Sequence, residues 1–137
     1  MGVSARERRL YPEKKDYPMS IQRVVPDISS VKMDESRKFY TEFLGFDIGM
    51  DMGWIMTFVS PQNPTAQLTV LKAQPSSQAP AISIEVDDVD SVHARAVEQG
   101  IGIVYPLTSE PWGVRRFFAV DPNGVVINVV SHVKKDA

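Results

Sequence analysis

The chain has 137 residues, of which 43% are hydrophobic and 23% charged, and its formal net charge is −2 at pH 7. This length and composition fit one globular domain, and so small a charge gives no sign of a nucleic-acid or membrane partner. The chain contains no cysteine, which excludes disulfides, thiolate metal sites and a cysteine nucleophile. No apolar run approaches the roughly 18 residues of a membrane span, and the N-terminus lacks the apolar segment of a secretory signal. We therefore expect a cytoplasmic protein.

The first part of the chain differs in composition from the rest. Residues 1–20 are rich in charged side chains and lack apolar periodicity. We interpret them as a flexible N-terminal arm or a non-native leader, in front of a single domain over residues 21–133. An arm that packs on a partner subunit is the alternative.

The first half of this domain is predicted to hold one strand, one helix and then three short strands. A strand is expected over residues 22–31, and apolar residues at helical spacing predict a helix over residues 34–44. Three strands follow over residues 46–51, 54–60 and 66–72, separated by turns that contain Gly and Pro. The order of elements is therefore βαβββ.

The second half repeats this order after a polar, proline-containing linker at residues 73–80. Its strand, helix and three further strands are expected over residues 81–86, 88–99, 102–107, 114–120 and 125–131.

The spacing within the two halves supports an internal repeat. Val31 and Gly45 are fourteen positions apart, as are Val86 and Gly100. Element order, spacing and turn position agree between residues 21–72 and residues 81–133, which indicates a duplicated unit. The alternative is two unrelated units of similar length. We therefore predict an α+β fold made of two βαβββ modules, with the helices outside the sheets.

Three motifs carry a resemblance to a known family. They are SRKFYTEFLGF at residues 36–46, EVDDVDSVHARAVEQG at residues 85–100 and PWGVRRFFAVDPNGVVINVV at residues 111–130. Together with the element order, over residues 21–133, they resemble the vicinal oxygen chelate superfamily of glyoxalases, bleomycin-resistance proteins and extradiol dioxygenases. The resemblance implies curled mixed sheets that enclose a cavity, and a homodimer. It does not settle the reaction, because the fold hosts binding proteins and several kinds of enzyme.

The resemblance also implies where a metal would bind. Enzymes of this superfamily hold one divalent ion with His, Glu or Gln side chains, two from each module. The corresponding positions of this sequence are Val25, Gln67, Ala81 and Asn128. Two of them are aliphatic and two are neutral amides, which are weak ligands for a divalent transition ion. A shift by two residues brings in Asp27 or Ser83, which still makes a poor site. We therefore predict no metal and no cofactor, and interpret His93 and His132 as surface residues.

Strand alternation predicts which side chains face the cavity. If the last hairpin has a two-residue turn, Asn128 pairs with Phe117, and Arg115 lies on the same face. One additional loop residue would exchange the roles of Arg115 and Arg116. The other predicted residues come from the matching positions of the first module, from the fifth strand and from the start of the seventh strand. The predicted ligand-binding residues are Trp54, Met56, Phe58, Gln67, Ser83, Glu85, Trp112, Arg115, Phe117 and Asn128.

These residues allow a structural and a functional interpretation. The aromatic side chains could simply fill a core, and Glu85 could pair with a buried arginine. A pocket with aromatic walls and a few polar groups is instead typical of a ligand site, where the arginine would meet an anionic or carbonyl-bearing ligand. No Ser-His-Asp spacing and no phosphate-binding glycine loop is found in the sequence.

The sequence therefore favours a metal-free small-molecule-binding protein of the glyoxalase/bleomycin-resistance type, with an apolar or aromatic ligand in its cavity. The alternative is a metal-dependent enzyme of the glyoxalase or dioxygenase type with displaced ligands. A third possibility is a metal-free isomerase or lyase that uses Glu85 or Asp27 as its base. The expected partners are the small molecule and a second copy of the chain, without nucleic acid or membrane.

Overall fold

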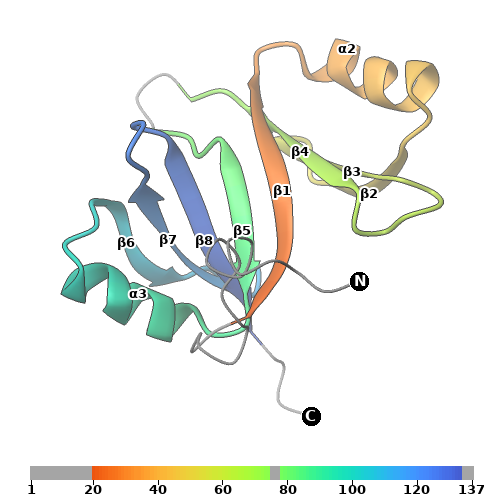
Figure 1. The fold of residues 1–137 in the computed structure, drawn as a ribbon. Helices are drawn as coiled ribbons and strands as arrows, with labels where there is room; N and C mark the ends of the chain where they lie inside the picture. The colour runs from red at the N-terminus through yellow and green to blue at the C-terminus, as the bar shows by residue number, and fades with distance from the viewer. Residues whose placement is uncertain (1–19, 75–77, 134–137) are drawn as a thin grey trace, which may run out of the picture.

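A computed structural model describes residues 20–74 and 78–133. The N-terminal arm expected at residues 1–20 lies outside the described residues except for Ser20, and so does the centre of the expected linker. The elements, shown in Figure 1, are β1 (Ile21–Ser30), α2 (Met33–Lys38), η2 (Phe39–Phe43), β2 (Asp47–Asp51), β3 (Ile55–Val59), β4 (Gln67–Lys72), β5 (Ile82–Val86), α3 (Val89–Glu98), β6 (Ile103–Ser109), β7 (Val114–Val120) and β8 (Val126–His132).

The predicted α+β fold and its duplicated element order are confirmed. The eight strands form one mixed sheet in the order β2-β3-β4-β1-β5-β8-β7-β6. Each half has the same internal order, because β1 pairs with β4 in parallel and β5 pairs with β8 in parallel. The halves meet where β1 and β5 pair antiparallel, side by side in the middle of Figure 1. The strand order is therefore symmetric about the β1–β5 boundary.

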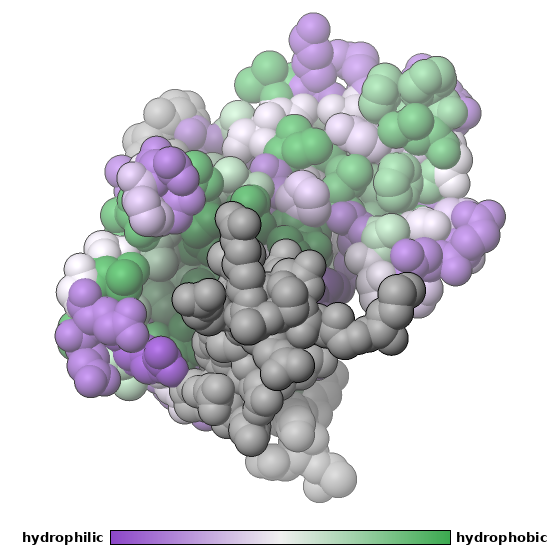
Figure 2. Space-filling model, in the orientation of Figure 1, coloured by the Kyte–Doolittle hydropathy of each residue, from purple (hydrophilic) through white to green (hydrophobic). Residues whose placement is uncertain are grey.

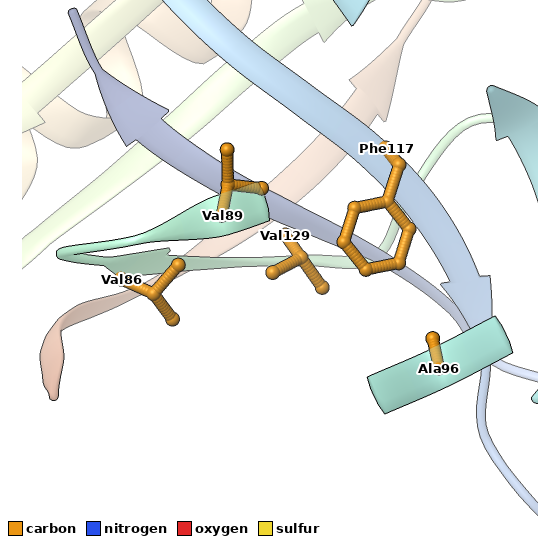
Figure 3. Close-up of a cluster of buried hydrophobic side chains, with 5 residues drawn as sticks. All are labelled: Val86, Val89, Ala96, Phe117 and Val129. Atoms are coloured by element: carbon orange, nitrogen blue, oxygen red, sulfur yellow. The ribbon is translucent and has the colours of Figure 1, made fainter. Parts of the chain in front are cut away.

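Each half has its own hydrophobic core between its strands and its helix. Val86, Val89, Ala96, Phe117 and Val129 form the core of the second half. Figure 3 shows Phe117 on β7 directed toward Ala96 of α3, with Val129 of β8 beside it. In the first half, the core cluster consists of Met56, Phe58 and Val70, with Tyr40 of the helix packed against it. The helices thus cover one face of the sheet, as predicted, and leave the other face open.

The last hairpin differs from its predicted register by one residue. Phe118, not Phe117, pairs with Asn128, and Val120 pairs with Val126. Asp121 Oδ1 accepts hydrogen bonds from the backbone N–H groups of Asn123 and Val125, both at 2.8 Å. Gly124 closes the loop with φ +81°, a left-handed conformation that glycine adopts without strain. The Asp121 N–H donates to the Val125 carbonyl oxygen at 2.9 Å, which leaves a loop of three residues, 122–124. This is a common hairpin length with glycine at the left-handed position.

This odd-numbered loop corrects the predicted positions of two β7 side chains. A shift of one residue turns every side chain of a strand to the other face. Arg115 and Phe117, predicted to face the cavity, therefore lie on the helix side of the sheet. Phe117 is 1% exposed in the core, and Arg115 donates to Asp90 of α3 with its Nε and Nη2 atoms at 3.0 to 3.2 Å.

The same one-residue error affects the first half, because its cavity-facing positions were predicted by matching them to those of the last hairpin. Met56 and Phe58 were predicted to face the cavity, but both are completely buried in the core beneath the first helix. Their neighbours Ile55, Thr57 and Val59 line the open side of the sheet instead. A strand inside a covered sheet needs apolar residues on its helix side, and the larger side chains of β3 fill that space.

The first helical segment is apolar on its surface at the C-terminal end, in η2 and Leu44. Figure 2 shows hydrophobic residues gathered over this end of the segment, whereas hydrophilic residues lie where Figure 1 labels α2. Phe39, Phe43 and Leu44 are 48%, 72% and 52% exposed, while Tyr40 packs inward against Phe58. None of the helices in residues 20–74 and 78–133 is long and apolar enough to cross a membrane.

The corrected register predicts that Phe117 matters for stability and that Arg115 does not. Phe117→Ala is expected to lower the free energy of unfolding by about 3–5 kcal/mol, because it leaves a cavity in the core. Arg115→Met is expected to change it by less than about 1 kcal/mol, because its ion pair with Asp90 is on the surface. Urea denaturation of both variants measures the two values. Equal losses in the two variants would contradict this placement.

Candidate ligand-binding site

The open face of the sheet forms a cavity with two adjoining lobes. One lobe has a volume of about 510 Å³ and the other of about 770 Å³. Both lobes draw on strands from the two halves of the chain, so the site depends on the whole sheet. The residues that line both lobes are Trp54, Ile55, Thr69, Ser83, Arg116 and Asn128.

Half of the predicted site residues line this cavity. They are Trp54, Gln67, Ser83, Trp112 and Asn128. Glu85 lies on the same face of β5 as Ser83, where its carboxylate pairs with neighbouring side chains and does not line either lobe. Met56, Phe58, Arg115 and Phe117 lie on the helix side, as described above. That the five lining residues contact a ligand stays a prediction.

The two tryptophans approach each other across the cavity. Trp54 precedes β3 in the first half and Trp112 precedes β7 in the second half. Their ring centroids are 6.2 Å apart at an interplanar angle of 69°, and both rings are close to half exposed. They offer aromatic surface from both halves to the same lobe, which both of them line.

Arg116 takes the position that had been predicted for Arg115. Its guanidinium carbon lies 5.3 Å from the ring centroids of Tyr105 and Trp112 and 4.9 Å from that of Phe118, within the range of cation–π attraction. Arg116 Nη2 donates to Glu110 Oε2 at 3.2 Å, and the Tyr105 hydroxyl donates to Glu110 Oε1 at 2.8 Å. Aromatic rings and one carboxylate therefore hold this guanidinium at the cavity wall.

A second polar cluster lies at the other end of the open face. Arg23 donates to Gln67 Oε1 at 2.7 Å and to Glu85 Oε2 at 2.9 Å. His132 Nδ1 lies 3.0 Å from the same Glu85 oxygen. Predicted as a surface residue, His132 lines the smaller lobe with a side chain that is 59% exposed. The Glu85 carboxylate thus links β5 to Arg23 of β1 and His132 of β8, and Arg23 links Gln67 of β4 to the cluster.

Asp27 lies on β1, four residues beyond Arg23, and lines the larger lobe. Its Oδ2 atom accepts a hydrogen bond from the Ser83 hydroxyl at 2.6 Å, and the Ser83 oxygen accepts one from Asn128 Nδ2 at 3.0 Å. Burial raises the pKa of Asp27 from 3.8 to about 6, against the lowering effects of the Ser83 hydrogen bond and the Arg116 charge. A carboxyl group that changes protonation near pH 6 thus lines the larger lobe.

Comparison with known proteins identifies the fold family. The family model described as Glyoxalase/Bleomycin resistance protein/Dioxygenase superfamily matches residues 21–129. The chain belongs to this superfamily. No curated protein matches the sequence significantly.

Several solved structures share the fold at low sequence identity. A superfamily member from Vibrio splendidus 12B01 has 14% identity and a TM-score of 0.60, with 82% of this chain and 99% of that one covered. The methylmalonyl-CoA epimerase of Mycobacterium tuberculosis has 18% identity and a TM-score of 0.59, over 83% and 88% of the two chains. A variant of homoprotocatechuate 2,3-dioxygenase from B. fuscum has 18% identity and a TM-score of 0.64, over 86% and 34%. At these identities the likeness concerns the fold alone.

The residues of this superfamily member do not fit the divalent metal that its enzymes hold. Val25, a predicted ligand position, pairs across the β1–β5 boundary with Ser83, whereas Ala81 precedes β5 and lines neither lobe. The amide oxygen of Gln67 already accepts from the cationic Arg23. Within the described part of the chain, no three His, Cys, Asp or Glu residues cluster as metal ligands would. Two guanidinium groups beside the site further oppose a divalent cation.

Several residues of the cavity were not among the predicted ligand-binding residues, and four of them belong to the cation–aromatic and polar clusters described above. These four are Arg23, Tyr105, Arg116 and Phe118. Gly124 was the available signal for Arg116 and Phe118, because glycine at this position of the DPNG turn favours a three-residue loop. Strand alternation places Arg23 on the face of Val25, two residues away. Nothing in the sequence indicated Tyr105, because β6 changes register twice against β7.

The raised pKa of Asp27 predicts a pH-dependent effect of its replacement. The folded protein binds the Asp27 proton more tightly than the unfolded chain does. The stabilisation that comes from the protonated carboxyl group is therefore fully present below pH 3.8 and is lost as the pH rises through about 6. Asp27→Asn is therefore expected to raise the free energy of unfolding by about 1–2 kcal/mol at pH 8. The gain should disappear near pH 4. Denaturation of both proteins at pH 4, 6 and 8 measures it, and a gain independent of pH would contradict the assignment.

Proposed function

We propose that this protein binds an apolar or aromatic small molecule in its open-face cavity without the help of a metal ion. The observation that carries the proposal is the composition of the cavity wall. Trp54 and Trp112 offer aromatic surface from the two halves, and Arg116 is held between aromatic rings at the same wall. A concave, mainly apolar site with a few fixed polar groups is typical of small-molecule recognition.

The donor chemistry favours binding over metal-dependent catalysis. The epimerase and the dioxygenase with the same fold show that the fold by itself is compatible with enzymes. A metal-dependent reaction of the glyoxalase or dioxygenase type needs several His or carboxylate ligands around one point. The cavity offers amides, a hydroxyl, arginines and the single carboxyl group of Asp27 there. The homodimer implied by the family resemblance stays a prediction.

Binding of aromatic compounds can be tested through the protein's own fluorescence. The chain has two tryptophans, and both line the smaller lobe. Nitroaromatic compounds are expected to quench this fluorescence in a saturable way and to raise the melting temperature. Trp54→Phe and Trp112→Phe should each weaken binding about three- to tenfold, because they reduce the stacking surface.

The control for this experiment is Arg115→Met, which changes a side chain on the helix side of the sheet. It should leave the affinity unchanged. Quenching that never saturates, or a loss as large in Arg115→Met as in the tryptophan variants, would exclude the cavity as the binding site.

The metal-free part of the proposal has its own test. Purified protein is expected to contain far less than one zinc, nickel, manganese or iron ion per chain, because no three His, Asp or Glu side chains of the described residues gather around one point. Elemental analysis by mass spectrometry, before and after addition of each ion and dialysis, measures the content. One retained ion per chain, lost in Gln67→Ala or Asn128→Ala, would favour the metal-dependent enzyme instead.

A further inference from the structure

Asp27 differs from the other two carboxylates of the open face. Glu85 is bonded to Arg23 and lies beside His132, and Glu110 is bonded to Arg116. The hydrogen bond of the Asp27 side chain within the described residues comes from the neutral Ser83 hydroxyl. Asp27 therefore keeps hydrogen-bonding capacity toward the larger lobe, where no cation of the described chain is bonded to it.

Two neighbouring groups at the same place are also unsatisfied. Asn128 Oδ1 and Arg116 Nε are buried polar atoms without a hydrogen-bond partner among residues 20–74 and 78–133. Asn128 and Arg116 line both lobes, and Asn128 connects to Asp27 through the Ser83 hydroxyl. Buried polar groups without partners are uncommon in folded proteins, and at a cavity wall they indicate a missing ligand or solvent partner. The middle of the cavity thus has two free acceptors and one free donor.

We propose that Asp27, Asn128 and Arg116 form the recognition site for a neutral carboxamide head group, carried by the aromatic ligand of the proposed function. The two amide N–H groups donate to the Asp27 carboxylate and to Asn128 Oδ1, and the amide carbonyl oxygen accepts from the Arg116 guanidinium. A primary carboxamide offers two donors and one acceptor oxygen, which complements the free groups of the cavity. This inference rests on the proposed binding function and adds the ligand's polar group to it.

The charges around this site favour a neutral head group over a cationic or an anionic one. A cationic amine would pair with Asp27 but would also meet Arg116 and Lys72, which line the same lobe. A carboxylate would pair with Arg116 but would meet the ionised Asp27, since the pKa of about 6 leaves this group charged at pH 8. A neutral group that both donates and accepts satisfies both sides without placing like charges together. Tyr105 and Phe118 flank this site with ring surface for the ligand's apolar part.

A matched series of nitrophenyl probes tests the proposal at pH 8. The probes are 4-nitrobenzamide, 4-nitrobenzoate, 4-nitrobenzylamine and, without a polar head group, 4-nitrotoluene, each titrated into the full chain by tryptophan quenching and calorimetry. The wild-type protein is expected to bind 4-nitrobenzamide at least fivefold more tightly than each of the other three. Asp27→Asn should weaken the binding of 4-nitrobenzamide at least fivefold and change the affinity for 4-nitrotoluene by less than twofold.

The matched control is Asp90→Asn, which removes an acid on α3 that bonds Arg115 on the helix side. Asp90→Asn should keep the preference of the wild-type protein for 4-nitrobenzamide. Circular dichroism of each variant checks that it is folded. Equal affinities for all four probes, tightest binding of the amine or the benzoate, or an unchanged preference in Asp27→Asn would overturn the inference while leaving the binding function intact. Failure of all four probes to bind would instead overturn the proposed function, and the inference with it.

Discussion

The antiparallel pairing of β1 and β5 turns two four-stranded halves into one sheet, and the cavity depends on it. In this register Val25 faces Ser83 and Arg23 faces Glu85. The pairing therefore brings Asp27 within hydrogen-bond distance of Ser83, and Arg23 within reach of Glu85, although these partners are more than fifty residues apart in sequence. A side chain one position along either strand would point to the other face of the sheet. The polar arrangement of the open face is consequently a property of this one strand boundary.

The charges on the open face are distributed so that two of the three carboxylates are neutralised locally. Arg23 meets Glu85 at one end, and Arg116 meets Glu110 under a cover of aromatic rings at the other. Within the described residues Asp27 has no bonded cation, and burial raises its pKa. This distribution of charge is the basis for proposing a metal-free site that takes a neutral polar group.

The superfamily fold supports several kinds of chemistry because the sheet is held by the cores on its helix side. Met56 and Phe58 fill one core, and Phe117 and Val129 fill the other, without contributing to the cavity. The opposite face of the same strands can then vary in polarity with little effect on the fold. At the four positions where the family resemblance implies metal ligands, this chain has Val25, Gln67, Ala81 and Asn128. Function must be argued from the open face, since the fold is shared with an epimerase and a dioxygenase.

The sequence by itself determined the order of elements, the duplication and the superfamily, because these depend on local periodicity and on spacings such as Val31 to Gly45. It also indicated Trp54, Gln67, Ser83, Trp112 and Asn128, whose positions follow from the ends of strands or from a motif. Only the tertiary structure decided which face of β3 and β7 is open. That choice depends on whether the loop after Asp121 holds two or three residues, and a single residue exchanges Arg115 with Arg116 and Phe117 with Phe118. The pairing of Asp27 with Ser83 likewise had to come from the structure, because the alignment of two distant strands is set by packing over the whole sheet and leaves no local pattern.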